Sequence, residues 1–130
     1  MNVELKELAV IADNRGWLTE ILKNDPSHAI EQIHFSVSKP GAIRGNHYHK
    51  NRTEWLVVTR GIGKIFLEDN ITKERSEQTL FADIPILIKI SPNITHTIVN
   101  SGDVPMHLLI ITNQKHDSKD TDTYPQPLHL

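Results

Sequence analysis

The chain has 130 residues and no cysteine, and 14 Lys and Arg against 16 Asp and Glu give it a formal charge of −2. This length fits one domain with a single core, and the lack of cysteine excludes disulfides, cysteine nucleophiles and thiolate-bound metals. The sequence contains no block of basic residues that would indicate a nucleic-acid partner. No apolar run approaches the roughly 20 residues that would cross a membrane. The N-terminal residues lack the pattern of a secretory signal, so we expect a cytoplasmic protein.

Short apolar or alternating runs, bounded by Gly, Pro, Asn and Asp, predict an all-β protein. In chain order the expected strands are 18–22, 32–38, 42–49, 53–59, 63–68, 77–81, 87–90, 96–100 and 106–112. This regular spacing favours a sandwich, barrel or jelly roll. A helical turn is expected only near Val3 to Leu8. Residues 113–130 are polar and are expected to form an extended tail on a single domain spanning residues 1–130.

Histidine is unusually frequent, with eight copies, and two of these lie close together in the sequence. On a strand, His47 and His49 project from the same face because side-chain direction repeats every two residues. A reversal over residues 50–53 would let Glu54 point back at the same place. His96, after the turn at Pro92, is a fourth candidate that a folded barrel could bring to the same end.

Three neutral imidazoles and one carboxylate suit a divalent ion such as Zn, Fe, Ni, Mn or Cu, and they leave a position open for water or substrate. The remaining five histidines are interpreted as surface or hydrogen-bonded residues: His28, His34, His107, His116 and His129. Trp17 and Trp55 are interpreted as core or subunit-interface residues rather than as platforms for a nucleotide base.

The spacing of these residues resembles the cupin superfamily. Its first motif, Gly, five residues, His-x-His, four residues, Glu, six residues, Gly, is present in full, whereas its second is present in part. Asn93 occupies the position of the second motif's usual turn glycine, and asparagine tolerates the left-handed conformation better than most residues. The resemblance implies a double-stranded β-helix, the jelly-roll barrel of cupins. The motif residues are Gly41, His47, His49, Glu54 and Gly61, then Pro92, His96 and Asn100.

Residues 13–20, Gln32 and residues 36–47 resemble the opening of sugar-nucleotide cupins related to dTDP-4-dehydrorhamnose 3,5-epimerase. More specifically, residues 40–49, 94–100 and 120–124 are similar to the C-terminal cupin domain of capsular-polysaccharide UDP-sugar epimerase/reductases. Nothing in the chain resembles the Gly-rich fingerprint of a nucleotide-binding reductase domain, so a separate reductase is an expected partner.

The resemblance implies metal-dependent epimerisation or isomerisation of a 4-keto-6-deoxy nucleotide sugar in surface-polysaccharide biosynthesis. The metal, most simply zinc with Ni, Mn or Fe as alternatives, would be bound by His47, His49, Glu54 and His96 and would polarise the ketone. Arg44 would hold the ketone or a diphosphate oxygen. In the rhamnose-pathway epimerases the histidine matching His47 is the base without a metal, so the resemblance leaves its role as ligand or catalytic base in conflict. We favour the ligand role.

Substrate contacts are further expected from Arg15, Gln32 and Lys50. Arg15 either reaches a diphosphate across the interface of a homodimer or is a solvated turn residue. Tyr48 is expected to point away from the histidines. Two other functions stay open. Three histidines and a glutamate also suit an Fe-dependent cupin dioxygenase, and a cupin without its reductase could be a non-catalytic, sugar-nucleotide-binding or regulatory module.

Overall fold

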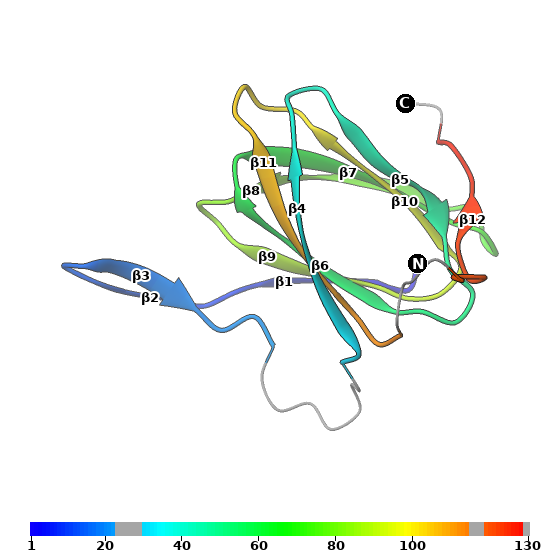
Figure 1. Ribbon diagram of the computed structural model, residues 1–130, viewed down its shortest axis with the longest axis horizontal. Helices are drawn as coiled ribbons and strands as arrows, with labels where there is room; N and C mark the ends of the chain where they lie inside the picture. Colours follow the sequence, from blue (N-terminus) through cyan, green and yellow to red (C-terminus); the bar gives the residue numbers. More distant parts are fainter. Residues whose placement is uncertain (23–29, 115–118, 129–130) are drawn as a thin grey trace.

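The computed structural model describes residues 1–22, 30–114 and 119–128, and within these ranges the chain forms strands and no helix. Two five-stranded antiparallel sheets face each other to form the barrel, and a two-stranded hairpin projects from it (Figure 1). This arrangement confirms the predicted all-β class and the jelly-roll barrel. Three of the five histidines that were interpreted as surface or hydrogen-bonded residues lie outside the described residues: His28, His116 and His129.

The first sheet has the order β1 (Val3–Glu7), β9 (Ile86–Ile90), β6 (Glu54–Arg60), β11 (Met106–Thr112) and β4 (Gln32–Ser38). The second has the order β12 (Tyr124–Pro125), β5 (Ile43–Tyr48), β10 (Ile94–Asn100), β7 (Ile62–Asp69) and β8 (Arg75–Phe81). The hairpin, called the arm below, consists of β2 (Val10–Asp13) and β3 (Gly16–Thr19).

The helical turn expected near Val3 to Leu8 is wrong. Val3–Glu7 is strand β1, which pairs along its whole length with β9, so that Val3 lies opposite Ile90 and Glu7 opposite Ile86. An isolated turn or two of helix is marginal in water, whereas an exposed sheet edge offers partners to the backbone groups that face it. Strands β2 and β12 were also not predicted, and the strand expected at 18–22 begins and ends earlier, as β3.

Strand β6 is buried on both faces from Glu54 to Val58, which places it at the centre of the molecule. Leu56 and Val58 belong to the main core cluster between the sheets, whereas Trp55 and Val57 belong to a second cluster on the other face of the same sheet. Trp55 is therefore a core residue, as predicted. Because β6 is fixed from both sides, Glu54 at its first position is fixed as well.

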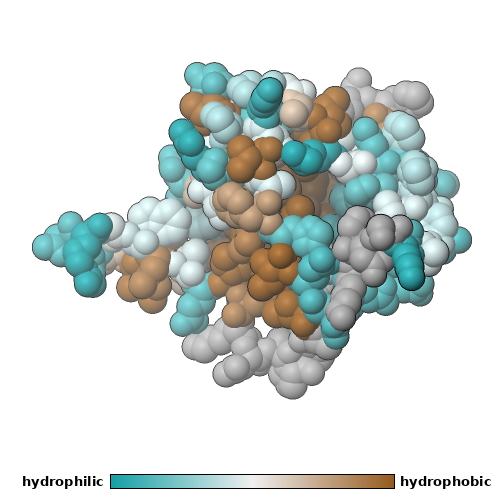
Figure 2. All heavy atoms as spheres, viewed as in Figure 1, coloured by the Kyte–Doolittle hydropathy of each residue, from teal (hydrophilic) through white to brown (hydrophobic). Residues whose placement is uncertain are grey.

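Strand β4 lies at the edge of its sheet and alternates in an unusual sense. Its polar residues, such as His34 and Ser36, are half-buried, whereas its apolar residues, such as Phe35, are exposed. Most half-buried strands show the reverse pattern, with apolar side chains turned inward. Figure 2 shows that apolar side chains also reach the surface of the barrel and of the arm. The inner face of β4 therefore turns polar side chains toward the barrel interior, and its outer face leaves apolar area uncovered.

Candidate metal centre and its cavity

Gly45 brings the two histidine-bearing strands together. In the pairing of β5 with β10, His47 lies directly opposite His96, and the register shifts just after this pair. Gly45 has a φ of +92°, and a Cβ built there would lie 2.5 Å from the carbonyl oxygen of His96. Only glycine fits this close, left-handed position, so the sequence Arg44-Gly45-Asn46-His47 places the His47 ring beside the His96 ring.

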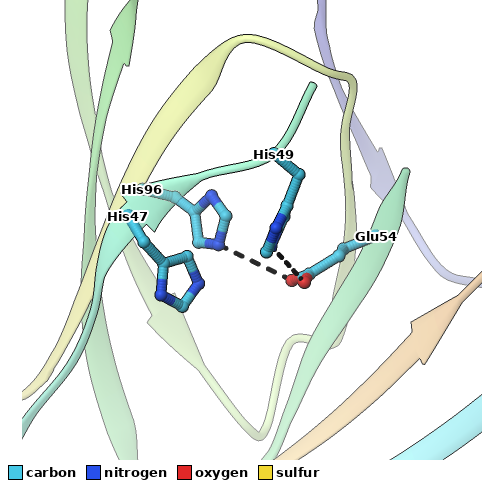
Figure 3. A group of neighbouring side chains, drawn as sticks. All are labelled: His47, His49, Glu54 and His96. Atoms are coloured by element: carbon cyan, nitrogen blue, oxygen red, sulfur yellow. Dashed lines mark ion pairs between the residues drawn. The ribbon is translucent and has the colours of Figure 1, made fainter. Parts of the chain in front are cut away.

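Four side chains from both sheets converge at one end of the barrel: His47, His49, Glu54 and His96 (Figure 3). One possible ligand atom from each lies within 4.8 Å of all the others. His49 Nε2 lies 2.8 Å from Glu54 Oε1, and His96 Nε2 lies 3.6 Å from Oε2 of the same carboxylate. His47 completes the group, with its ring centroid 4.7 Å from that of His96. The four residues that the sequence singled out therefore meet.

Backbone carbonyls orient two of these rings. The Nδ1 atom of His49 lies 2.7 Å from the carbonyl oxygen of Asp122, and Nδ1 of His96 lies 3.1 Å from that of Ile94. Since a carbonyl oxygen only accepts hydrogen bonds, each Nδ1 must carry the proton. In the neutral rings the lone pair is then on Nε2, the nitrogen that faces Glu54, as a metal ligand requires.

Burial and charge act against each other on the ionisable groups here. Burial alone would raise the pKa of Glu54, but the His49 ring, 2.8 Å from its carboxylate, and the charges of the neighbouring histidines outweigh it and lower the pKa to about 2. Burial lowers the pKa of His49, yet the Glu54 carboxylate more than offsets this and the pKa is raised. For His96 burial prevails and the pKa is lowered. The site therefore holds an ionised carboxylate and at least one neutral imidazole at neutral pH.

The donor set fits a divalent metal ion. His49 Nε2 is buried, yet it makes no hydrogen bond of acceptable geometry, although it lies 2.8 Å from Glu54. Buried nitrogen atoms are rarely left in this state, and an ion that accepts the lone pair would resolve it. Imidazole and carboxylate ligands without thiolate are compatible with Zn, Ni, Mn and Fe.

The turn before His96 keeps its expected form. Asn93 has a φ of +68°, so it adopts the left-handed conformation predicted for the position where the second cupin motif usually has glycine. Its backbone N–H donates to the carbonyl oxygen of His49 at 2.7 Å. The turn thus connects the His96 strand to the loop that carries His49.

A cavity of about 320 Å³ opens beside the four side chains. Arg44 lies in its wall, where Nε donates to Ser38 Oγ at 2.7 Å and Nη2 to the carbonyl of Val37 at 3.1 Å. The inward face of β4 adds His34 and Ser36 to the lining. The sequence analysis missed both residues, although the polar alternation along Gln32–Ser38 was the available signal. This volume is in the range of small-molecule sites.

Three expected substrate contacts do not line this cavity in the described part of the chain: Arg15, Gln32 and Lys50. Arg15 lies at the tip of the arm with its side chain 86% exposed and pairs with Asp13 at 2.6 Å. Lys50 is exposed and its Nζ lies 4.5 Å from the centroid of the Tyr124 ring. Tyr48, which was expected to point away from the histidines, stacks on Tyr124 with ring centroids 5.1 Å apart, and it is not among the described residues that line the cavity.

Residues 11–124 match the family described as the polysaccharide biosynthesis C-terminal domain. The chain is 30% identical over 113 residues to the UDP-2-acetamido-2,6-beta-L-arabino-hexul-4-ose reductase of Pseudomonas aeruginosa, covering 87% of this chain and 30% of that protein. The capsular polysaccharide assembling protein CapF of Staphylococcus aureus is 31% identical with a TM-score of 0.71, covering 95% of this chain and 33% of CapF. The chain therefore spans about a third of the length of these two relatives.

A variant of the 3,4-ketoisomerase QdtA from Thermoanaerobacterium thermosaccharolyticum, solved in complex with TDP-4-keto-6-deoxyglucose, is 26% identical with a TM-score of 0.79. Here the match covers 94% of this chain and 86% of the ketoisomerase. These similarities confirm the resemblance to sugar-nucleotide cupins. As for membranes, the described residues include no helix long and apolar enough to span one.

Proposed function

Because the chain belongs to the polysaccharide biosynthesis C-terminal domain family, we propose that it is a metal-dependent epimerase or isomerase of a 4-keto-6-deoxy nucleotide sugar in surface-polysaccharide biosynthesis. One observation carries the proposal. Three histidines and a glutamate converge within 4.8 Å beside a cavity of ligand size. The ketoisomerase QdtA, whose complex contains a 4-keto-6-deoxy sugar nucleotide, supports the substrate class.

In this proposal His47, His49, Glu54 and His96 hold the metal, with zinc as the first expectation. When bound, the metal supplies Lewis acidity that stabilises negative charge on the keto oxygen. The ionised state of Glu54, whose pKa is lowered to about 2, favours a cation at this position throughout the neutral range. Because the four side chains come from both sheets, the barrel itself sets the spacing of the ligands.

The cavity walls would bind the sugar and move its proton. The guanidinium of Arg44, held against β4 by two hydrogen bonds, offers planar donors for a ketone or diphosphate oxygen. Removal of a proton next to a ketone also requires a base. His34, half-buried in the cavity wall, is a candidate for this group if His47 is a metal ligand. His47 itself is the base in the alternative without a metal.

We further propose a cytoplasmic homodimer that works with a separate reductase. The arm exposes Ile11, Trp17 and Leu18, and β4 exposes the outer faces of Ile33 and Phe35. Exposed apolar groups of this kind commonly mark association surfaces. In a dimer the arm of one subunit would lie on the other, and Arg15 at its tip would reach the partner's substrate.

Hydrogen exchange with solvent tests the activity directly. Incubation of TDP- and UDP-4-keto-6-deoxyglucose with zinc-loaded protein in D₂O should replace a carbon-bound hydrogen next to the ketone by deuterium, measured by mass spectrometry and NMR. Glu54→Gln should slow this exchange by a factor on the order of 100 or more. Glu68→Gln removes a second buried carboxylate that pairs with Arg75 instead, and it should leave the rate unchanged.

The other outcomes separate the alternatives. Tight binding of the sugar nucleotide without exchange, under every metal offered, would contradict the enzyme proposal and indicate a binding module. Uptake of O₂ by an iron-loaded protein, without deuterium incorporation, would indicate a dioxygenase. Exchange at the full rate in the presence of a strong chelator would indicate a metal-free epimerase in which His47 is the base.

A further inference from the structure

The C-terminal segment 120–124 contacts the loop that carries His49, and nothing in the metal motif accounts for these contacts. Asp122 is buried, although it is an acidic residue in a tail expected to lie on the surface. Its carboxylate accepts hydrogen bonds from three successive backbone N–H groups, those of Lys50 at 2.8 Å and of Asn51 and Arg52 at 3.0 Å each. The side chain of Asp122 therefore fixes the backbone immediately after His49.

The same residue fixes the His49 ring through its backbone. The Asp122 carbonyl oxygen lies 2.7 Å from His49 Nδ1. Nη1 of Arg52 lies 3.3 Å from the same nitrogen, but Arg52 and a protonated Nδ1 are both donors and cannot bond to each other. The Asp122 carbonyl, an acceptor, therefore favours the proton on Nδ1, whereas the Glu54 carboxylate 2.8 Å from Nε2 favours it on Nε2 when no cation is bound. A metal ion at Nε2 and Glu54 would remove this competition and leave the choice of tautomer to the carbonyl.

A buried ion pair holds the segment in place. Arg52 is buried, and its Nη2 lies 3.1 Å from Asp120 Oδ1. Asp120 also accepts hydrogen bonds from the Thr123 hydroxyl and, at 2.8 Å, from the Asp122 backbone N–H. Two residues further along, β12 pairs with β5, with Pro125 opposite His47. The tail and the ligand-bearing strand are thus joined by charge, hydrogen bonds and sheet pairing.

We propose that Asp122 is a positioning residue for the metal site: its carboxylate fixes the 50–52 loop and its carbonyl selects the His49 tautomer that presents Nε2 to the metal. Partners of this kind around a ligand histidine typically change metal affinity by 10- to 100-fold when they are lost. The inference rests on the proposed function only in so far as it concerns metal binding, since the tautomer is a property of the chain itself.

The first experiment reads the tautomer without metal. Long-range ¹H–¹⁵N NMR of histidine-labelled, zinc-free Glu54→Gln protein, in which no carboxylate faces Nε2, should show the proton on Nδ1 at a pH where His49 is neutral. Adding Asp122→Ala keeps the backbone carbonyl but removes the carboxylate that holds residue 122 on the 50–52 loop, so the carbonyl should lose its contact with Nδ1 and the ring should populate the Nε2–H tautomer. Adding Asp103→Ala instead, the same change at an exposed position in the β10–β11 connection, should leave the proton on Nδ1. An unchanged Nδ1–H ring in Asp122→Ala would overturn the proposal.

The second experiment measures zinc affinity by competition with a chromophoric chelator. Asp122→Ala should weaken zinc binding by about 10- to 100-fold, Asp122→Asn by less because its amide oxygen can still accept, and Asp103→Ala not at all. A folded Asp122→Ala protein with wild-type affinity, whose melting temperature falls equally with and without zinc, would show a merely structural role and overturn the proposal.

Two safeguards keep the outcomes distinct. If Asp122→Ala does not fold, both the NMR and the zinc-affinity measurements are made on Asp122→Asn, with Asp103→Asn as the control. If the wild type binds no zinc, the proposed function fails in its metal-dependent form, and the NMR experiment alone decides whether Asp122 sets the tautomer.

Discussion

The cavity end of the barrel and the arm differ in how much of their structure the chain itself supplies. At the cavity end, Glu54 is 8% exposed and His96 is 5% exposed, and backbone carbonyls orient the rings of His49 and His96. On the arm, Trp17 is 54% exposed and Leu18 is 58% exposed. A polar site has thus been completed inside the barrel while apolar surface outside it is left uncovered. The first region is preorganised by its own fold, whereas the second would be covered only by another surface, such as that of the proposed dimer.

The largest expected difference between the two regions is in the free energy of unfolding when a glycine is replaced by alanine. Gly45→Ala should lower the free energy of unfolding by about 3 kcal/mol, because a Cβ there meets the His96 carbonyl at 2.5 Å in a left-handed conformation. Gly16→Ala, on the arm, should cost only about 1 kcal/mol, since its φ is also positive but nothing lies within 4 Å. Urea unfolding of the zinc-free proteins measures both. Equal costs would show that the two strands do not approach as described.

The next effect concerns the arm. Trp17→Ser combined with Leu18→Ser should change the stability of the folded monomer by less than about 0.5 kcal/mol, because both side chains are exposed in it. The same change should weaken the proposed dimer by a factor on the order of ten or more, measured by sedimentation equilibrium. The control is Ile71→Ser, which also replaces an exposed apolar side chain by serine, at a turn far from the arm in sequence. A double variant that dimerises like the wild type would remove the arm from the interface.

A smaller effect is expected from acid on the tail. Burial raises the pKa of Asp120, but the hydrogen bonds from Thr123, Asp122 and Arg52 outweigh it and hold the pKa well below 3.8, its ordinary value. The folded state thus binds this proton less readily than the unfolded state, so the stabilisation is complete above pH about 4 and is lost as the pH falls further.

Chemical unfolding of zinc-free protein checks this dependence. The stability difference between wild type and Asp120→Asn should be constant near neutral pH and should shrink below pH about 4. Asp103→Asn, at an exposed position, should show no such change. A stability difference that grows as the pH falls would contradict a stabilising role of the Arg52–Asp120 ion pair.

Three of the four possible metal ligands could be predicted because their arrangement depends on local sequence. His47 and His49 share a strand face through simple alternation, and Glu54 follows after a reversal of four residues. His96 required knowledge of the barrel, since its pairing with His47 joins strands far apart in the chain. The family resemblance supplied that knowledge, and the left-handed Asn93 preserved the turn on which it depended.

What the sequence did not predict depends on contacts that no local pattern records. Strand β1 forms because β9 offers it an edge, and β12 forms because the tail returns to β5. The burial of Asp122 has the same origin, since its partners are 70 to 72 residues away. His34 was interpreted as an ordinary surface or hydrogen-bonded residue, because its strand would normally turn apolar residues inward; here the cavity reverses that preference.

The metal content of the purified protein tests the central claim most directly. Elemental analysis should find about one zinc, nickel, manganese or iron ion per wild-type chain and per Glu68→Gln chain, and almost none in Glu54→Gln. Because Glu68 and Glu54 are equally buried, at 8% exposure, this comparison separates loss of a ligand from loss of a buried carboxylate. A wild-type protein that stays empty when these metals are offered, or a Glu54→Gln protein that keeps its metal, would contradict the account.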